Sequence, residues 1–142
     1  MDTEGTEVHG EHREDSRILD HGTALSSRVI RLAIEVHRHL GPGLLEGVYE
    51  ECLHFELTRS GLAADRQVSF PLIYKDIRFE SGYRADIVVE GRLIVEIKSV
   101  EQLLPVHEAR ILTYLRLSGY RVGLLMNFNT AALKNGLRRF VR

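Results

Sequence analysis

The stretch Arg92-Leu-Ile-Val-Glu-Ile-Lys-Ser99 decides how the fold is interpreted. Its branched aliphatic residues follow Gly91 and predict a buried β-strand. Side chains alternate between the two faces of a strand, so Glu96 and Lys98 are expected on the same face. Charged side chains on a buried strand are costly unless they pair or take part in chemistry. Asp86, ten residues before Glu96, adds an acid from the preceding predicted strand.

The number of residues in the hairpin loop decides whether Asp86 joins Glu96. A two-residue loop would turn Asp86 away from Glu96, because a shift of one residue moves a side chain to the other face. A three-residue loop Val89-Glu90-Gly91, with Gly91 in the left-handed conformation, places Asp86 opposite Ile94 and diagonal to Glu96. We therefore predict an odd-numbered loop.

Two carboxylates that converge in a partly dry site repel one another unless a cation lies between them. Oxygen ligands suit Mg²⁺ or Mn²⁺ rather than zinc, and the backbone carbonyl of Ile97 can add a ligand to Asp86 and Glu96. Lys98 would hold or help to deprotonate a metal-bound water, or stabilise charge on a phosphate. The pattern indicates phosphodiester hydrolysis. The alternative is a structural pair between Lys98 and a carboxylate, which is the more frequent origin of an isolated Glu-x-Lys.

The rest of the chain predicts an α/β domain. Residues 1–23 are polar and acidic and predict a flexible tail, so the domain is expected to span residues 24–142. The elements are expected in the order α, α, β, β, β, α, β and then a last edge strand. Their approximate ranges are 26–39, 44–59, 67–74, 78–89, 92–99, 106–118, 121–128 and 137–141.

The two helices before the first strand have recognisable ends. Ser26 or Ser27 can cap the first helix, and the turn Gly41-Pro42-Gly43 breaks it. Gly61 ends the second helix. The second helix is expected to carry one apolar stripe, formed by Leu45, Val48, Cys52 and Phe55.

Composition gives a weaker signal than the motifs. The chain is 44% hydrophobic and 27% charged, as is typical of a globular protein. Residues 1–22 hold seven of the 20 acidic residues and two of the 19 basic ones, which leaves the remainder at +4. This excess is compatible with nucleic acid without requiring it. No apolar stretch approaches a membrane span, the N-terminus lacks a signal-peptide pattern, and Cys52 is alone, so a cytoplasmic location is expected.

Further motifs point to a known family. Gly43-Leu-Leu-Glu46-Gly-Val-Tyr49 occurs together with Tyr83-Arg84-Ala85-Asp86 and Val95-Glu96-Ile97-Lys98. Over roughly residues 26–142, the chain resembles the family named for its Gly-x-x-Glu-x-x-Tyr motif, a branch of the PD-(D/E)xK nuclease-like superfamily. This resemblance implies a restriction-endonuclease-like core, in which helices flank a mixed central β-sheet.

The resemblance also implies roles for individual residues. Glu46 matches the acid that the helix before the sheet brings to the metal, Asp86 and Glu96 match the metal-binding acids, and Lys98 matches the catalytic lysine. The alternative for Glu46 is a carboxylate that only complements the helix dipole. Tyr49 is expected to orient Glu46, to contact a ligand or to pack in the core.

One position departs from the family pattern. Many relatives carry Gln four residues before the tyrosine of the helix that follows Glu-x-Lys, whereas here Arg110 precedes Tyr114. Arg110 either clamps a substrate phosphate, or pairs with Glu96 or Asp86 and displaces the metal. The second arrangement would make the protein an inactive member. The residues assigned to substrate binding are Arg84, Arg110, Tyr49 and Tyr114.

The sequence thus predicts a Mg²⁺- or Mn²⁺-dependent nuclease that cleaves DNA, or RNA, with a metal-activated water. The alternative is a catalytically degenerate module that binds nucleic acid or a protein partner. A homodimer paired through the last strand, or a partner that supplies specificity, is a further hypothesis. For Arg138, Arg139 and Arg142, a solvated surface is favoured over phosphate contact.

Overall fold

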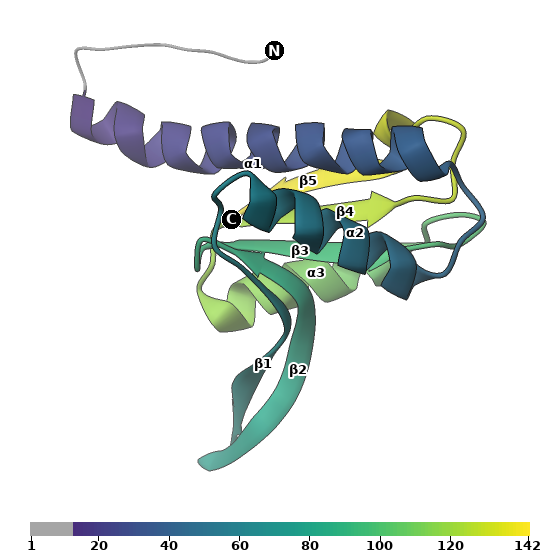
Figure 1. Cartoon of the computed structure of the whole chain (residues 1–142). Helices are drawn as coiled ribbons and strands as arrows, with labels where there is room; N and C mark the ends of the chain where they lie inside the picture. The colour runs from purple at the N-terminus through teal and green to yellow at the C-terminus, as the bar shows by residue number, and fades with distance from the viewer. Residues whose placement is uncertain (1–12) are drawn as a thin grey trace.

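The computed structural model describes the backbone of residues 13–142 and the side chains of residues 24–142. The element order confirms the predicted α/β class (Figure 1). The elements are α1 (Arg13–Leu40), α2 (Glu46–Arg59), β1 (Ala64–Tyr74), β2 (Ile77–Val89), β3 (Leu93–Lys98), α3 (Pro105–Ser118), β4 (Val122–Asn127), the short 3₁₀ helix η1 (Leu133–Gly136) and β5 (Leu137–Val141).

The strands of the described residues form one mixed sheet in the order β1-β2-β3-β4-β5. Neighbouring strands are antiparallel except β3 and β4, which are parallel because α3 crosses between them. Figure 1 shows α1 and α2 over one face of the sheet and α3 on the other. The expected mixed central sheet flanked by helices is therefore present, and β3 lies at its centre.

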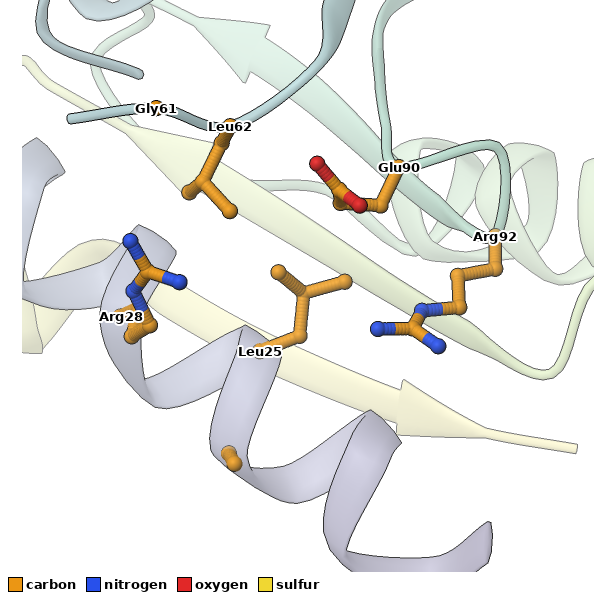
Figure 2. A pocket seen from close by; sticks show the side chains of 7 residues that line it. Leu25, Arg28, Gly61, Leu62, Glu90 and Arg92 are labelled. Atoms are coloured by element: carbon orange, nitrogen blue, oxygen red, sulfur yellow. The ribbon is translucent and has the colours of Figure 1, made fainter. Parts of the chain in front are cut away.

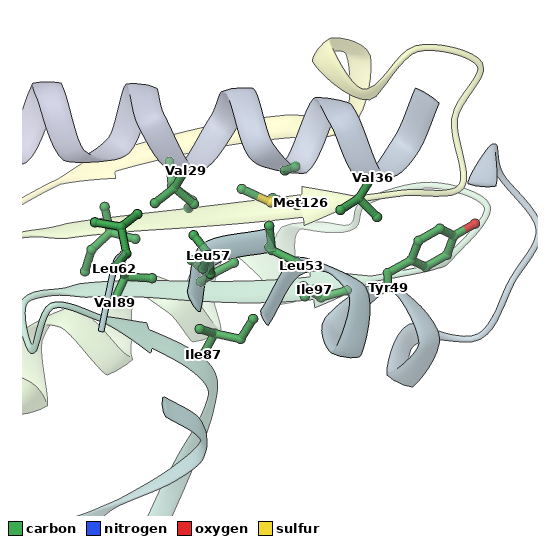
Figure 3. Packing of buried hydrophobic residues seen from close by; sticks show 14 of the residues in the cluster. Val29, Val36, Tyr49, Leu53, Leu57, Leu62, Ile87, Val89, Ile97 and Met126 are labelled. Carbon is green, nitrogen blue, oxygen red and sulfur yellow. The ribbon is translucent and has the colours of Figure 1, made fainter. Parts of the chain in front are cut away.

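The main core lies between the sheet and the pair α1 and α2 (Figure 3). Val29 of α1, Leu53 and Leu57 of α2, and Ile97 of β3 have no exposed surface. Burial of each such side chain contributes about 1.5–3 kcal/mol. A second cluster lies beneath α3 on the opposite face and contains Ala85, Val88, Ile94 and Leu115.

The first helix begins earlier than the sequence suggested. α1 starts at Arg13, and Ser26 is a buried residue inside it rather than its cap. Once a packed segment has nucleated a helix, each further residue adds a hydrogen bond, so the helix extends into the polar sequence before it. Residues 13–23 are thus helical, and the rest of the predicted tail lies outside the described residues. Neither α1 nor any other described helix is long and apolar enough to cross a bilayer.

The predicted apolar stripe of α2 is wrong. Leu45 is 79% exposed and Phe55 is 57% exposed, while Cys52 is only partly buried. A second stripe with four-residue spacing competes with the predicted one and faces the core instead. The buried residues of α2 are Tyr49, Glu50, Leu53 and Leu57.

β1 and β2 extend beyond the sheet as a two-stranded arm (Figure 1). The turn at its tip is Lys75-Asp76, as predicted, and both residues have positive φ angles of 49° and 71°. Asp86, a predicted site residue, lies next to the end of the β2–β3 pairing, where the arm leaves the sheet (Figure 1).

Candidate active site

The hairpin of β2 and β3 has the odd-numbered loop that the sequence predicted. The loop is Glu90-Gly91-Arg92, and Gly91 has the expected positive φ of 63°. The predicted loop was placed one residue too early. The observed register therefore brings Asp86 opposite Glu96, rather than opposite Ile94.

The regular ladder between β2 and β3 ends at the pair Ile87 and Val95. Beyond this pair, carboxylates replace backbone carbonyls as acceptors. The backbone N–H of Asp86 donates to Glu96 Oε2 at 3.1 Å, and that of Ile97 donates to Asp86 Oδ2 at 2.8 Å. The two acids bridge an opening between the strands. We name this pair of acids, Asp86 and Glu96, the acid fork.

Burial disfavours the charged forms of both acids in the fork. Glu96 is 5% exposed, and its pKa is raised from 4.5 to about 8, first by burial and next by the charge of the nearby Asp86 carboxylate. Burial also raises the pKa of Asp86. Glu96 therefore holds its proton at neutral pH unless a cation offsets its charge.

Two cationic side chains face the fork without closing it. Lys98 lowers the pKa of both carboxyl groups through its charge. Arg110 is exposed on α3 and lowers the pKa of Glu96. Among the described residues, neither cation forms a direct ion pair with Asp86 or Glu96. Within residues 24–142, Arg110 therefore does not take the place of a metal between the acids. The alternative of a direct structural ion pair between Lys98 and a carboxylate is not present there either.

Glu46 lies in the first turn of α2, beside the end of β3. Its Oε2 accepts a hydrogen bond from the Ser99 backbone N–H at 3.3 Å, and Ser99 Oγ donates to the Leu44 carbonyl at 2.6 Å. Within residues 24–142, no group of three or more Asp, Glu, His or Cys side chains is placed to hold a metal. The geometry thus does not bring Glu46 together with Asp86 and Glu96 as a third ligand.

Tyr49 is a core residue, and the predicted direct contact with a substrate is wrong. It has no exposed surface, and its ring stacks on Phe128 with centroids 4.5 Å apart. The hydroxyl donates to the Gly41 carbonyl at 2.5 Å and accepts from the Leu44 N–H at 3.1 Å. Tyr49 therefore fixes the turn before α2 and, through it, the position of Glu46.

The other predicted substrate contacts lie around the fork. Tyr114 is half-buried on α3, and its pKa is raised by burial and then by the charge of Glu96, which places it beside that acid. Arg84 is exposed on β2, two residues before Asp86. Their contact with a substrate stays a prediction.

Glu50 and Gln67 also lie beside the fork, although neither was predicted from the sequence. Glu50 is only 6% exposed, and its carboxylate accepts hydrogen bonds from Arg66 Nε at 2.9 Å and from Gln67 Nε2 at 2.9 and 3.0 Å. One signal was available, since Glu50 precedes Leu53 and Leu57 by three and seven residues, which is the spacing of one helix face. Gln67 gave no such signal.

Asn127 was also missed as a structural support of the site. It pairs with Lys98 across the β3–β4 ladder and is 2% exposed. Its side-chain amide donates to the Val100 carbonyl at 2.9 Å, and its oxygen accepts from the Val100 N–H at 3.0 Å and the Asn129 N–H at 3.2 Å. Asn127 thus clamps the chain that leaves β3 directly after Lys98.

A pocket of about 300 Å³ lies at the other end of the hairpin (Figure 2). Its nearest lining residue on this side, Arg92, precedes Glu96 by four residues, or about 13 Å at 3.3 Å per residue. The pocket shares no residue with the fork and is not part of the candidate site. Its lining residues are Ala24, Leu25, Arg28, Gly61, Leu62, Glu90 and Arg92.

Comparison with known protein families shows to which family the chain belongs. A sequence profile of the PD-(D/E)XK nuclease superfamily matches residues 23–140, which is most of the chain. The chain belongs to the PD-(D/E)XK nuclease superfamily. This membership confirms the superfamily part of the resemblance, while the Gly-x-x-Glu-x-x-Tyr branch stays a prediction. Neither the curated proteins nor the solved structures contain a significant match to this PD-(D/E)XK protein.

Proposed function

We propose that this PD-(D/E)XK protein hydrolyses phosphodiester bonds of DNA, or of RNA, at the acid fork. The observation that carries the proposal is the opening of the β2–β3 ladder. There, each of the carboxylates of Asp86 and Glu96 accepts a hydrogen bond from a backbone N–H of the other strand. Each carboxylate uses one oxygen in these bonds, and Asp86 Oδ1 accepts only a long hydrogen bond from Gln67 at 3.4 Å. A carboxylate oxygen can accept more than one partner, so the other oxygens of the pair can accept further ligands.

The residues of the fork fit a hard divalent cation such as Mg²⁺ or Mn²⁺. Mg²⁺ usually keeps several waters and binds through one or two carboxylates, which agrees with a pair of acids rather than a triad. Asp86, Glu96 and the carbonyl of Ile97 would hold the ion. The Ile97 N–H faces β2, and the N–H and C=O of one strand residue point to the same neighbouring strand. When bound, such an ion would acidify a water and neutralise phosphate charge.

The remaining polar groups would bind and orient the substrate. Lys98 shares a strand face with Glu96 and has no direct ion pair among the described residues, so its ammonium is available to hold the attacking water or a phosphate oxygen. Arg84 and Arg110 are exposed near the fork and would contact phosphates, which position nucleic acid without reading its sequence. Tyr114 would contact the substrate next to Glu96.

A non-catalytic module that binds nucleic acid or a protein is the second candidate function. Two observations favour it. Arg110 occupies the position where a glutamine was expected, and no third acidic ligand joins the fork within the described side chains.

Calorimetric titration with Mg²⁺ and Mn²⁺, paired with cleavage assays on single-stranded, duplex and branched DNA and on RNA, separates the two functions. We expect the wild type and the exposed-acid control Glu51→Gln to bind the ions and to cleave, and Asp86→Ala and Glu96→Ala to do neither. A wild type that binds no ion and cleaves no substrate would contradict the enzyme. Retained nucleic-acid binding would then support the module.

A reducing cytoplasmic location and a homodimer or specificity partner remain part of the proposal. Cys52 is a free thiol, which suits a reducing compartment. Size-exclusion chromatography with light scattering at several concentrations would test self-association.

A further inference from the structure

Gln67 of β1 has a backbone conformation that residues other than glycine rarely adopt. Its φ is +53°, in the left-handed region, which costs roughly 1–2 kcal/mol for an L residue with a Cβ atom. It lies across from Asp86 in the β1–β2 ladder. The pairs on either side are regular, but Gln67 and Asp86 are not themselves paired. A strained residue thus stands beside an acid of the fork.

The side-chain alternation of β2 shifts at this place. Ala85 and Val88 pack into the same cluster beneath α3, although they are three residues apart. Ile87 packs on the other face, under α1 and α2. Residues three apart in a regular strand face opposite sides of the sheet. The alternation of side chains in β2 is therefore interrupted between Ala85 and Ile87, at Asp86.

The alternation of β1 shifts at the matching position. Ala64 packs against the core under α1 and α2, whereas Val68 packs against the cluster beneath α3. Ala64 and Val68 are four residues apart, and in a regular strand this even spacing would place both side chains on one face. Gln67 lies between them and is the residue with positive φ. Irregularities of this kind turn a strand and re-aim neighbouring side chains, here that of Asp86.

The side chain of Gln67 connects α2 to the fork. Its Nε2 donates to both oxygens of Glu50 at 2.9 and 3.0 Å, and makes a long hydrogen bond to Asp86 Oδ1 at 3.4 Å. Glu50 is itself anchored by Arg66. The other Asp86 oxygen accepts from the Ile97 N–H, so the carboxylate is held at both ends. Without the amide, Glu50 and Asp86 would repel each other with no donor between them.

We propose that Gln67 is a positioning residue of the fork, whose amide, held by Glu50, fixes the orientation in which Asp86 meets a divalent cation. This role rests on the proposed function. Hydrogen bonds that orient a metal-binding carboxylate change metal affinity by about 10- to 100-fold when they are removed. The left-handed backbone of Gln67 is maintained because it directs the amide toward both acids.

Gln67→Met and Gln67→Gly test this role together. The methionine keeps the side-chain length but removes both N–H donors, and the glycine removes the side chain while accepting positive φ. The matched control is Lys75→Met, which alters another residue of positive φ at the exposed tip of the arm. Mn²⁺ dissociation constants are measured by calorimetry, and kcat and KM by cleavage, well below each unfolding midpoint.

We expect both Gln67 variants to bind Mn²⁺ about tenfold or more weakly, with lower kcat and little change in KM, and the control to match the wild type. A purely structural role would lower the unfolding midpoint of Gln67→Met but leave Mn²⁺ affinity unchanged. Wild-type Mn²⁺ affinity in both Gln67 variants would overturn the positioning role alone. Absence of Mn²⁺ binding by the wild type would overturn the proposed function and the positioning role with it.

Discussion

The two ends of the β2–β3 hairpin differ in how the two strands are joined. At the loop end, Val89 pairs with Leu93, and both side chains are buried in the main core. At the fork end, the ladder stops, and carboxylates accept the hydrogen bonds that backbone carbonyls would take. The difference shows that apolar pairing holds the hairpin together at one end, which allows the other end to present groups whose charge is disfavoured by burial.

Lys98→Met should give the largest effect, and it acts at the fork end alone. We expect cleavage to fall by about 100-fold or more, which is the lower range for losing an acid–base group, while Mn²⁺ affinity is retained because Lys98 is not a ligand. Single-turnover cleavage and calorimetry measure the two quantities. Lys75→Met serves as the control, and activity within a few-fold of the wild type would remove Lys98 from the mechanism.

Leu93→Ala should damage the loop end and leave the fork intact. Leu93 is 1% exposed, so truncation leaves a cavity and is expected to lower the free energy of unfolding by about 2–5 kcal/mol. Urea denaturation measures this loss, and Leu112→Ala, at a residue that is 47% exposed, is the milder control. A matching loss of Mn²⁺ affinity in the folded variant would show that the two ends are not separable.

Glu96→Gln should change how stability depends on pH. Glu96 has a pKa near 8 in the folded protein and about 4.5 when unfolded, so the folded state holds the proton to higher pH. The wild-type free energy of unfolding is therefore expected to fall as pH rises from about 4.5 to 8, by up to about 5 kcal/mol in total. Glu96→Gln should lack most of this fall, and Glu51→Gln should retain it. The check is urea denaturation with EDTA at pH 5 and pH 9, where parallel behaviour of Glu96→Gln and wild type would refute the assignment.

Gly91→Ala should give the smallest effect, at the loop itself. Because Gly91 has a φ of +63°, a Cβ atom there is expected to cost about 1 kcal/mol of stability. Gly47→Ala, in a helix with open space around the site, should instead stabilise by up to about 1 kcal/mol. Opposite shifts in the thermal unfolding midpoint are the expected result, and equal shifts would indicate that the loop conformation is not strained by a side chain.

Local patterns were enough to predict the elements and the existence of the fork. Apolar strand residues and Gly91 predicted the hairpin, because turn chemistry and strand period are properties of a few neighbouring residues. The odd loop was predicted from the condition that Asp86 lie on the same face as Glu96. The final register was one residue off, since Glu90 also takes a positive φ, which its residue type does not signal. That shift moved Asp86 from a diagonal to a direct position opposite Glu96.

The features missed by the sequence depend on contacts between distant segments. The buried face of α2 is chosen by what packs on it, and two apolar stripes were available. Burial of Glu50 requires donors from β1, namely Arg66 and Gln67. The positive φ of Gln67 has no local cause, because glutamine is not a turn-forming residue, and it is stabilised only by acids on two other elements.

The arm of β1 and β2 gives the fork a dynamic property. Glu96 and Lys98 lie on β3, which pairs with β4 from Leu93 to Lys98, whereas Asp86 lies where the arm departs. Local opening of the arm, a fluctuation that amide hydrogen exchange detects, would part Asp86 from Glu96 while the central strands stay folded. We therefore expect the two acids to belong to units of different opening free energy. A ligand that bridges them would slow amide exchange along the arm, far from its own point of contact.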